Sequence, residues 1–458
     1  MAIASINPAT GVTEQIFEAH TAAEVQTRIA QAQAAFEQLL STDFATRARW
    51  MRASADLLEQ DLDRAATMLT REMGKTVTQA RAEVRKSAAT MRFYADNGER
   101  FLAEERLDDP SSVGASAAYT RYEPIGPVLA VMPWNFPIWQ VIRFAAPALV
   151  AGNTVLLKHA SNVPQAALYL DELFTRGGFP EGAFRALLIP AGAVEGVLRD
   201  HRVVAATLTG SEPAGRSVAA IAGSEVKHVV LELGGSDPFI VMPSADLDAA
   251  VATGITARTS NNGQACINAK RFIVHSGIYD AFVERFTAAM SQLVVGDPLD
   301  ESTDIGPVAT ESGRAELAEL VDDALAKGAT ATVGGAPLEG AGWFYAPTVL
   351  TGVTPEMRIY AEEAFGPVAT VYRAADAAEA LTIANDTAFG LSSAVWTRDA
   401  ADEAFFVRGL EVGAVFVNGM SASYPQLPFG GVKTSGVGRE LAAVGMREFT
   451  NLKTVWRG

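Results

Sequence analysis

From residue 128 onward, short apolar runs alternate with segments of helical pattern. Five such runs occupy residues 128–132, 154–157, 186–189, 205–208 and 229–233. Runs of this length separated by helices are typical of βαβ units, whose strands lie parallel in one sheet. The sequence therefore predicts a doubly wound α/β fold, in which ligands bind beyond the carboxyl ends of the strands.

Residues of candidate binding motifs stand at the ends of these runs, where ligands are expected. Asn135 follows the first run, Lys158 the second and Gly210 the fourth, while Glu232 lies at the end of the fifth. The carboxyl ends of parallel strands meet at one edge of a sheet. We therefore expect these residues to face a common crevice.

The chain on either side of these runs also has a regular pattern. Thr21 and Glu24 have the spacing of a capping box at a helix start, and helical patterns fill residues 45–105. A second series of strands and helices includes apolar runs at 239–242 and 272–275. We expect helices before the first sheet and a second α/β unit after it.

Length and composition limit the class of protein. The 458 residues are 49% hydrophobic and 20% charged, which is typical of a soluble globular protein with two or three domains. The net charge of −16 argues against sequence-independent binding to nucleic acids. Prolines interrupt the longest apolar stretch, 128–152, so we expect no membrane partner. Residues 1–8 lack the pattern of a signal peptide, which predicts a cytoplasmic protein.

Cys266 is the only cysteine in the sequence, so an intramolecular disulfide is excluded and we expect no metal site. A single cysteine is most often a small buried hydrophobe. The alternative is a nucleophile, because a reactive thiolate needs a partly open, electropositive setting. The flanking Gly263-Gln264 and Lys270-Arg271 favour the nucleophile.

The segment Gly263-Gln264-Ala265-Cys266, with Arg271 five residues later, resembles the nucleophile loop of the aldehyde dehydrogenases. Four other segments resemble the same family in the family's order: Pro133-Trp134-Asn135-Phe136-Pro137, Leu231-Glu232-Leu233-Gly234-Gly235, Glu362-Glu363-Ala364-Phe365-Gly366-Pro367 and Pro428-Phe429-Gly430-Gly431. Five matches in order are far more specific than any one of them. Within the family, the short bacterial NADP-dependent succinate-semialdehyde dehydrogenases are most similar, through Lys158-His159-Ala160-Ser161-Asn162-Val163-Pro164 and Ser423-Tyr424-Pro425.

The resemblance implies an aldehyde dehydrogenase-like α/β fold with three parts. We expect a Rossmann-type dinucleotide-binding domain over residues 1–110 and 126–232, and a second α/β catalytic domain over residues 233–435. Residues 111–125 and 436–458 would form a small β arm for oligomerisation. The expected assembly is a homodimer or a homotetramer.

Aldehyde oxidation by this family implies three catalytic residues. Cys266 would add to the carbonyl to form a thiohemiacetal, which loses hydride to become a thioester. Asn135 and the Cys266 N–H would stabilise the oxyanion, unless Asn135 only caps the next helix. Glu232 would activate the hydrolytic water, unless it is a solvated strand-end carboxylate. Family members that pass the acyl group to coenzyme A lack this glutamate, so its presence favours water.

The loop 209–215 lacks the dinucleotide fingerprint G-x-G-x-x-G. Gly210 permits a tight strand-to-helix turn, and Ser211 with the helix amides can receive a pyrophosphate, although a purely structural turn is the alternative. By the resemblance, Glu363 bonds the nicotinamide ribose and Phe365 packs near the nicotinamide. The residues expected to contact the cofactor are Trp134, Lys158, Ser161, Gly210, Ser211, Gly215, Glu363 and Phe365.

Ser161 predicts which nicotinamide cofactor is preferred. Many NAD-preferring relatives have a glutamate there, which bonds the adenosine ribose hydroxyls and repels a 2′-phosphate. Ser161 removes that charge, and Lys158 can neutralise the phosphate. We therefore expect NADP to be preferred and NAD to be used more weakly.

Arg143 indicates the substrate, because relatives that act on apolar aldehydes commonly have an aromatic residue at this position. A buried arginine usually has an anionic partner. The partner is either an aspartate or glutamate of the chain, or a substrate carboxylate held together with Ser423 beside a wall formed by Trp139. The second alternative suits a short anionic aldehyde such as succinate semialdehyde.

Two other interpretations remain open from the sequence. The same mechanism could act on another semialdehyde, such as glutarate semialdehyde, or on a small apolar aldehyde. The chain could also be a catalytically silent structural protein on the same scaffold. Such a scaffold needs none of Asn135, Glu232 and Cys266, so their joint presence favours an enzyme.

Overall fold

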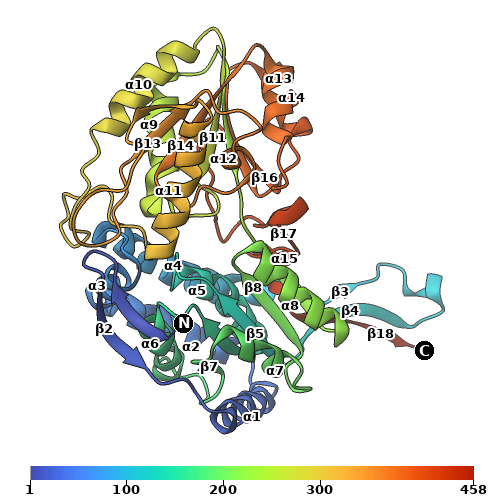
Figure 1. Ribbon diagram of the computed structural model, residues 1–458. Helices are drawn as coiled ribbons and strands as arrows, with labels where there is room; N and C mark the ends of the chain where they lie inside the picture. The colour runs from blue at the N-terminus through green and yellow to red at the C-terminus, as the bar shows by residue number, and fades with distance from the viewer. Residues whose placement is uncertain (1) are drawn as a thin grey trace.

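The computed structural model describes residues 2–458, which form four β-sheets and the helices that cover them (Figure 1). The N-terminal part is a β-hairpin followed by four helices. The predicted capping box is present, because Thr21 Oγ1 accepts from the Glu24 N–H and the Glu24 carboxylate accepts from the Thr21 N–H. These elements are β1 (Ile3–Asn7), β2 (Val12–Phe17), α1 (Ala22–Leu39), α2 (Phe44–Gln60), α3 (Leu62–Met73) and α4 (Val77–Phe101). The hairpin was not among the predicted elements.

A six-stranded sheet follows, with strand order β17-β9-β8-β5-β6-β7, and all its strands except β17 are parallel. Its strands are β5 (Pro127–Met132), β6 (Thr154–His159), β7 (Phe184–Ala186), β8 (Ala205–Thr209), β9 (His228–Glu232) and β17 (Gly436–Val437). Its helices are α5 (Trp139–Ala151), α6 (Pro164–Arg176), α7 (Val194–Leu198) and α8 (Glu212–Ser224). The predicted doubly wound sheet is thus confirmed.

One predicted strand is misplaced. The run 186–189 was expected to be a strand, but β7 ends at Ala186. After Leu187 the chain leaves the sheet, and the Leu188 backbone exchanges hydrogen bonds with His20, whose Nδ1 accepts from the Leu188 N–H. The apolar residues Leu187 and Ile189 are still buried, which explains the strand-like pattern.

The second α/β unit has a seven-stranded sheet with order β12-β13-β14-β11-β10-β15-β16, and lies above the first in Figure 1. Its strands are β10 (Asp237–Val241), β11 (Ala269–His275), β12 (Thr330–Val333), β13 (Thr348–Thr351), β14 (Val368–Ala374), β15 (Ser392–Trp396) and β16 (Ala414–Val417). Its helices are α9 (Leu247–Thr259), α10 (Tyr279–Ser291), α11 (Glu311–Ala326), α12 (Arg358–Ala361), α13 (Ala377–Asn385) and α14 (Ala400–Gly409). Separate apolar clusters fill the two faces of this sheet.

After the second unit, the chain returns to the first. β17 pairs with the outer edge of β9, and α15 (Ala442–Arg447) packs on α4 and α5. The chain then ends in β18 (Thr450–Arg457), which pairs along its whole length with β4 (Ala117–Pro124). With β3 (Glu105–Arg106) these strands form an arm that projects from the body in Figure 1. Within residues 2–458, no helix combines the length and apolar character needed to cross a membrane.

Candidate active site

Cys266 lies in a tightly held loop between α9 and β11. Asn261 and Asn262 adopt left-handed backbone conformations, with φ of 57° and 56°, which asparagine tolerates better than most residues. Gly263 also has a left-handed backbone, with φ of 74°, and in addition a Cβ there would lie 2.4 Å from the Gly366 backbone carbonyl. The buried Arg258 guanidinium bonds the carbonyls of Gly263 and Gly366, so it ties the two segments together.

Lys270 also stabilises the loop that carries Cys266. Its ammonium donates to the carbonyl oxygens of Ala265, at 3.0 Å, and Cys266, at 2.7 Å. It also pairs with the Glu363 carboxylate at 2.7 Å. Lys270 therefore joins the nucleophile loop to a residue predicted to bind the cofactor.

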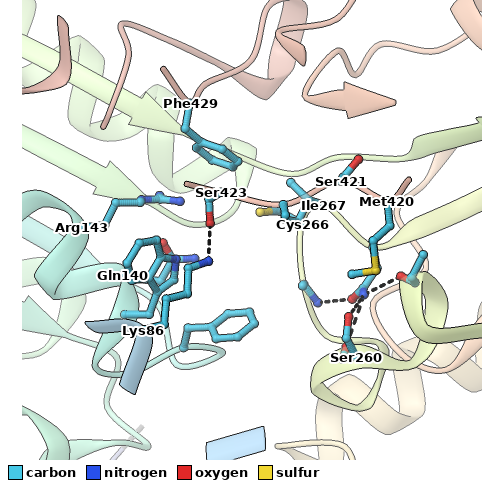
Figure 2. Close-up of a pocket in the computed structure, with 16 residues that line it drawn as sticks. Lys86, Gln140, Arg143, Ser260, Cys266, Ile267, Met420, Ser421, Ser423 and Phe429 are labelled. Carbon is cyan, nitrogen blue, oxygen red and sulfur yellow. Dashed lines mark hydrogen bonds between the residues drawn. The ribbon is translucent and has the colours of Figure 1, made fainter. Parts of the chain in front are cut away.

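The Cys266 thiol faces a cavity of about 160 Å³, drawn in Figure 2. All three residues predicted to bind the substrate line this cavity, namely Trp139, Arg143 and Ser423. Burial raises the pKa of Cys266 to about 12, whereas Arg143 and Lys270 act in the opposite direction. The thiol is therefore protonated at neutral pH in this state and needs a proton acceptor to become a nucleophile.

Asn135 lies beside the nucleophile loop, because its side-chain amide donates to the Gln264 carbonyl at 3.0 Å. An asparagine amide has two N–H groups, so one can still donate to another acceptor. Asn135 is not the cap of α5. The Ile138 and Trp139 amides at that helix start donate to the Glu83 carboxylate, at 2.8 and 2.9 Å. The helix-cap alternative that the sequence left open is therefore wrong.

Glu232 ends β9 and is 2% exposed, so the alternative of a solvated carboxylate is wrong as well. Neither carboxylate oxygen has a hydrogen-bond partner among residues 2–458. Burial raises the pKa of Glu232 well above 4.5, and Glu440 adds to the rise while Arg143 opposes it. Gly430 makes room for the group, since a Cβ there would lie 2.7 Å from Glu232 Oε1.

Arg143 has an anionic partner within the chain. Its guanidinium pairs with the buried Glu440, donates to Thr209 Oγ1 at 3.2 Å, and stands 4.8 Å from the centre of the Phe429 ring. The structure thus contains the ion pair that the sequence left open as one alternative. Arg143 still forms part of the cavity wall, as Figure 2 shows.

A larger cavity of about 690 Å³ contains four of the eight residues predicted to contact the cofactor: Trp134, Ser211, Glu363 and Phe365. The Trp134 and Phe365 rings meet edge to face, with centroids 5.6 Å apart. Ser211 precedes α8 without bonding the helix amides through its side chain, so these amides remain available to an anion. Gly215 lets α8 approach β9, since a Cβ there would lie 2.6 Å from the Leu233 side chain.

Lys158 and Ser161 lie at the end of β6 and outside that cavity wall. Lys158 is 8% exposed, and its ammonium has no ion pair or hydrogen bond with any residue that the structure describes. Desolvation lowers its pKa. An unpaired, desolvated ammonium group is a donor suited to a phosphate, and Ser161, three residues later in the chain, offers a hydroxyl group as a second donor. These residues therefore fit a phosphorylated dinucleotide.

Sequence reasoning missed two charged residues of the site. Glu440 pairs with Arg143, and Lys86 of α4 donates to Ser423 Oγ at 2.8 Å within the Cys266 cavity. Neither residue lies in a short sequence motif that would indicate its role. Lys86 lies in a helix rich in charged residues, where a lysine is normally solvated.

The chain belongs to the aldehyde dehydrogenase family, whose model matches residues 1–455. The resemblance based on five motifs is therefore confirmed. A protein of Mycolicibacterium paratuberculosis named succinate-semialdehyde dehydrogenase (NADP(+)) is 62% identical over 462 residues, which cover 100% of this chain and 97% of the relative. One of Mycobacterium tuberculosis, with the same name followed by the number 1, is 61% identical over 456 residues and covers 100% of both chains.

Solved structures agree with the family assignment. Succinic semialdehyde dehydrogenase from Streptococcus pyogenes, in complex with NADP+, has a TM-score of 0.96 and 34% identity, with 99% of each chain covered. The predicted aldehyde dehydrogenase-like α/β fold is thus confirmed. NADP+, which we predicted as the preferred cofactor, is the one that these relatives' names contain.

Proposed function

We propose that this aldehyde dehydrogenase oxidises succinate semialdehyde to succinate with NADP+. The observation that carries the proposal is the single cavity that contains Cys266, Arg143, Trp139 and Ser423. It combines a nucleophile with cationic and hydroxyl groups suited to an anionic aldehyde. The names of relatives at 61–62% identity over the full chain support the same substrate and cofactor.

Each catalytic residue would have one task. The Cys266 thiol would release its proton to solvent water and its sulfur would attack the aldehyde carbon. The second Asn135 N–H and the Cys266 backbone N–H would stabilise the oxyanion by about 3 kcal/mol per donor. NADP+, held by the Ser211 loop, Lys158, Ser161 and Glu363, would supply the hydride acceptor. Glu232 would then take a proton from the water that hydrolyses the thioester on Cys266.

The domain division predicted from the sequence is part of this proposal. The six-stranded sheet would bind the dinucleotide, and the seven-stranded sheet would present Cys266. The β4–β18 arm would join subunits of a homodimer or homotetramer, since Leu452 and Trp456 expose more than half of their surface on it. Analytical ultracentrifugation of the chain with and without residues 450–458 tests the role of the arm.

A steady-state screen of aldehydes against both cofactors tests the proposed function. We expect kcat/KM to be highest for succinate semialdehyde with NADP+, lower for glutarate semialdehyde, and lower still for butanal, which lacks the carboxylate. A maximum with glutarate semialdehyde or butanal would assign the same chemistry to another substrate. No turnover with any aldehyde would favour the catalytically silent scaffold.

The Ser161→Glu variant tests the cofactor preference. A carboxylate at this position would repel the 2′-phosphate of NADP+ and could bond the ribose hydroxyls of NAD+. We expect kcat/KM for NADP+ to fall by about 10- to 100-fold, and kcat/KM for NAD+ to be unchanged or higher. Ser161→Gln, which adds bulk without charge, is the matched control. Equal losses with both cofactors would place the 2′-phosphate elsewhere.

A further inference from the structure

Lys86 projects from α4 into the cavity that contains the nucleophile. Its ammonium donates to Ser423 Oγ at 2.8 Å and stands 4.1 Å from the centre of the Trp139 ring. Figure 2 shows this side chain and that of Cys266 directed into the same space. Two of its neighbours, Ser423 and Trp139, were predicted to contact the substrate on other grounds.

Lys86 also lines a second, more open cavity of about 430 Å³. The two cavities share Lys86, Phe136, Trp139 and Ser260. Lys86 therefore borders both the cavity that contains Cys266 and its neighbour.

The ammonium of Lys86 has no carboxylate partner within 4 Å among residues 2–458. In this respect it differs from its charged neighbours, because Lys75 pairs with Glu83, Arg143 with Glu440 and Lys270 with Glu363. Desolvation lowers the pKa of Lys86 to about 8, and the nearby Arg143 charge adds to this effect. Because a desolvated cation without a partner is energetically unfavourable, binding an anion there would lower the free energy.

The charges of the cavity wall point to the same ligand. The wall of the Cys266 cavity includes the two cations Lys86 and Arg143 and no aspartate or glutamate. Arg143 is already paired with Glu440, which does not itself line the cavity. Lys86 is therefore the cation of this wall that can form a new ion pair without breaking an existing one.

We propose that Lys86, together with Ser423, forms the subsite that binds the carboxylate of the aldehyde substrate and so determines its preference for short ω-carboxylated aldehydes. This inference rests on the proposed function and adds a residue that the sequence did not indicate. The ammonium would donate to the carboxylate while the aldehyde carbon lies at Cys266. Arg143 would contribute positive charge from a fixed position.

The Lys86→Met variant tests this subsite, because methionine keeps the unbranched length and removes the charge. We expect KM for succinate semialdehyde to rise by about 10- to 100-fold, the range for losing a charge-assisted hydrogen bond. KM and kcat for butanal should change by less than about 2-fold. Lys86→Arg should retain most of the preference, and Lys327→Met, which removes a surface charge elsewhere, should leave both substrates unaffected. Lys86→Gln replaces Lys86→Met if thermal unfolding shows that methionine is not tolerated.

Equal losses with the two aldehydes would overturn the inference, since they would indicate a structural role for Lys86. Calorimetric titration with succinate tests the Lys86 subsite independently of turnover, so that failure of the subsite can be distinguished from failure of the proposed function. If the wild-type enzyme did not prefer succinate semialdehyde, the proposed function would be wrong. The subsite would still stand if succinate bound the wild-type enzyme at least about 10-fold more tightly than Lys86→Met, and would fall if the two affinities were equal.

Discussion

Replacement of Cys266 by alanine is expected to lower kcat for succinate semialdehyde by at least about 10⁴-fold. Removing the nucleophile of a covalent mechanism leaves only binding and oxyanion stabilisation, and losses of this size are typical. Alanine fits the loop, whose conformation depends on Asn261, Asn262, Gly263 and Arg258 rather than on the thiol. NADPH formation followed by absorbance gives the rate, and thermal unfolding confirms that the variant is folded.

Because the sequence has one cysteine, chemical modification provides an independent control. One equivalent of iodoacetamide per chain should abolish turnover of the wild-type enzyme, and none should be incorporated by the alanine variant. With the pKa of Cys266 raised to about 12, only a small fraction of the thiol is ionised at neutral pH. Alkylation of the ligand-free enzyme should therefore accelerate by about tenfold per pH unit as the pH rises. Substantial turnover by the alanine variant would contradict the mechanism.

Replacement of Glu232 by glutamine is expected to lower the steady-state rate by about 10²- to 10⁴-fold, the usual contribution of a general base. Glutamine has nearly the same shape but cannot accept a proton. Formation of the thioester should persist, so mixing enzyme, NADP+ and succinate semialdehyde should release a burst of about one NADPH per active site. Mass spectrometry should detect the acyl group on Cys266, and hydroxylamine should remove it without the aid of the carboxylate.

The pH dependence of hydrolysis should report the same residue. The pKa of Glu232 is raised well above 4.5, so the carboxylate is protonated, and inactive as a base, over a wider pH range than an exposed glutamate. The steady-state rate should consequently fall as the pH is lowered through that raised pKa, and the dependence should disappear in Glu232→Gln. Glu440→Gln is the comparison variant, because it removes another buried carboxylate, whose charge contributes to the raised pKa of Glu232. If both variants lowered the rate equally, the decrease would be due to the loss of a buried negative charge. It would not then indicate a general base at position 232.

Much of the fold was evident from local pattern. Apolar runs of four or five residues predicted β5, β6, β8 and β9, because a strand buried on both faces needs a continuous apolar segment. The same criterion failed at 186–189, where the apolar residues are buried but the Leu188 backbone bonds His20. Burial gives the same pattern whether or not a segment joins a sheet. The position of His20 depends on the fold of the whole N-terminal part.

The candidate site was evident only in part. Cys266, Asn135 and Glu232 could be proposed as catalytic residues because each lies in a short contiguous motif. The partners of the charged residues could not, since Lys86 meets Ser423 across a separation of 337 residues and Glu440 reaches Arg143 from the segment after the second sheet. From the sequence alone, two partners accordingly remain open for Arg143, and no pattern indicates a role for Lys86.

Residue type and short spacing were enough to identify the family and to propose Cys266 as the nucleophile, with Asn135 and Glu232 at the strand ends as its proposed catalytic partners. Which buried charges are neutralised within the chain, and which remain available to a ligand, became evident from the packing of remote segments. The physical reason is that the energy of a desolvated charge depends on its distance from other charges, and that distance is set by how remote segments pack.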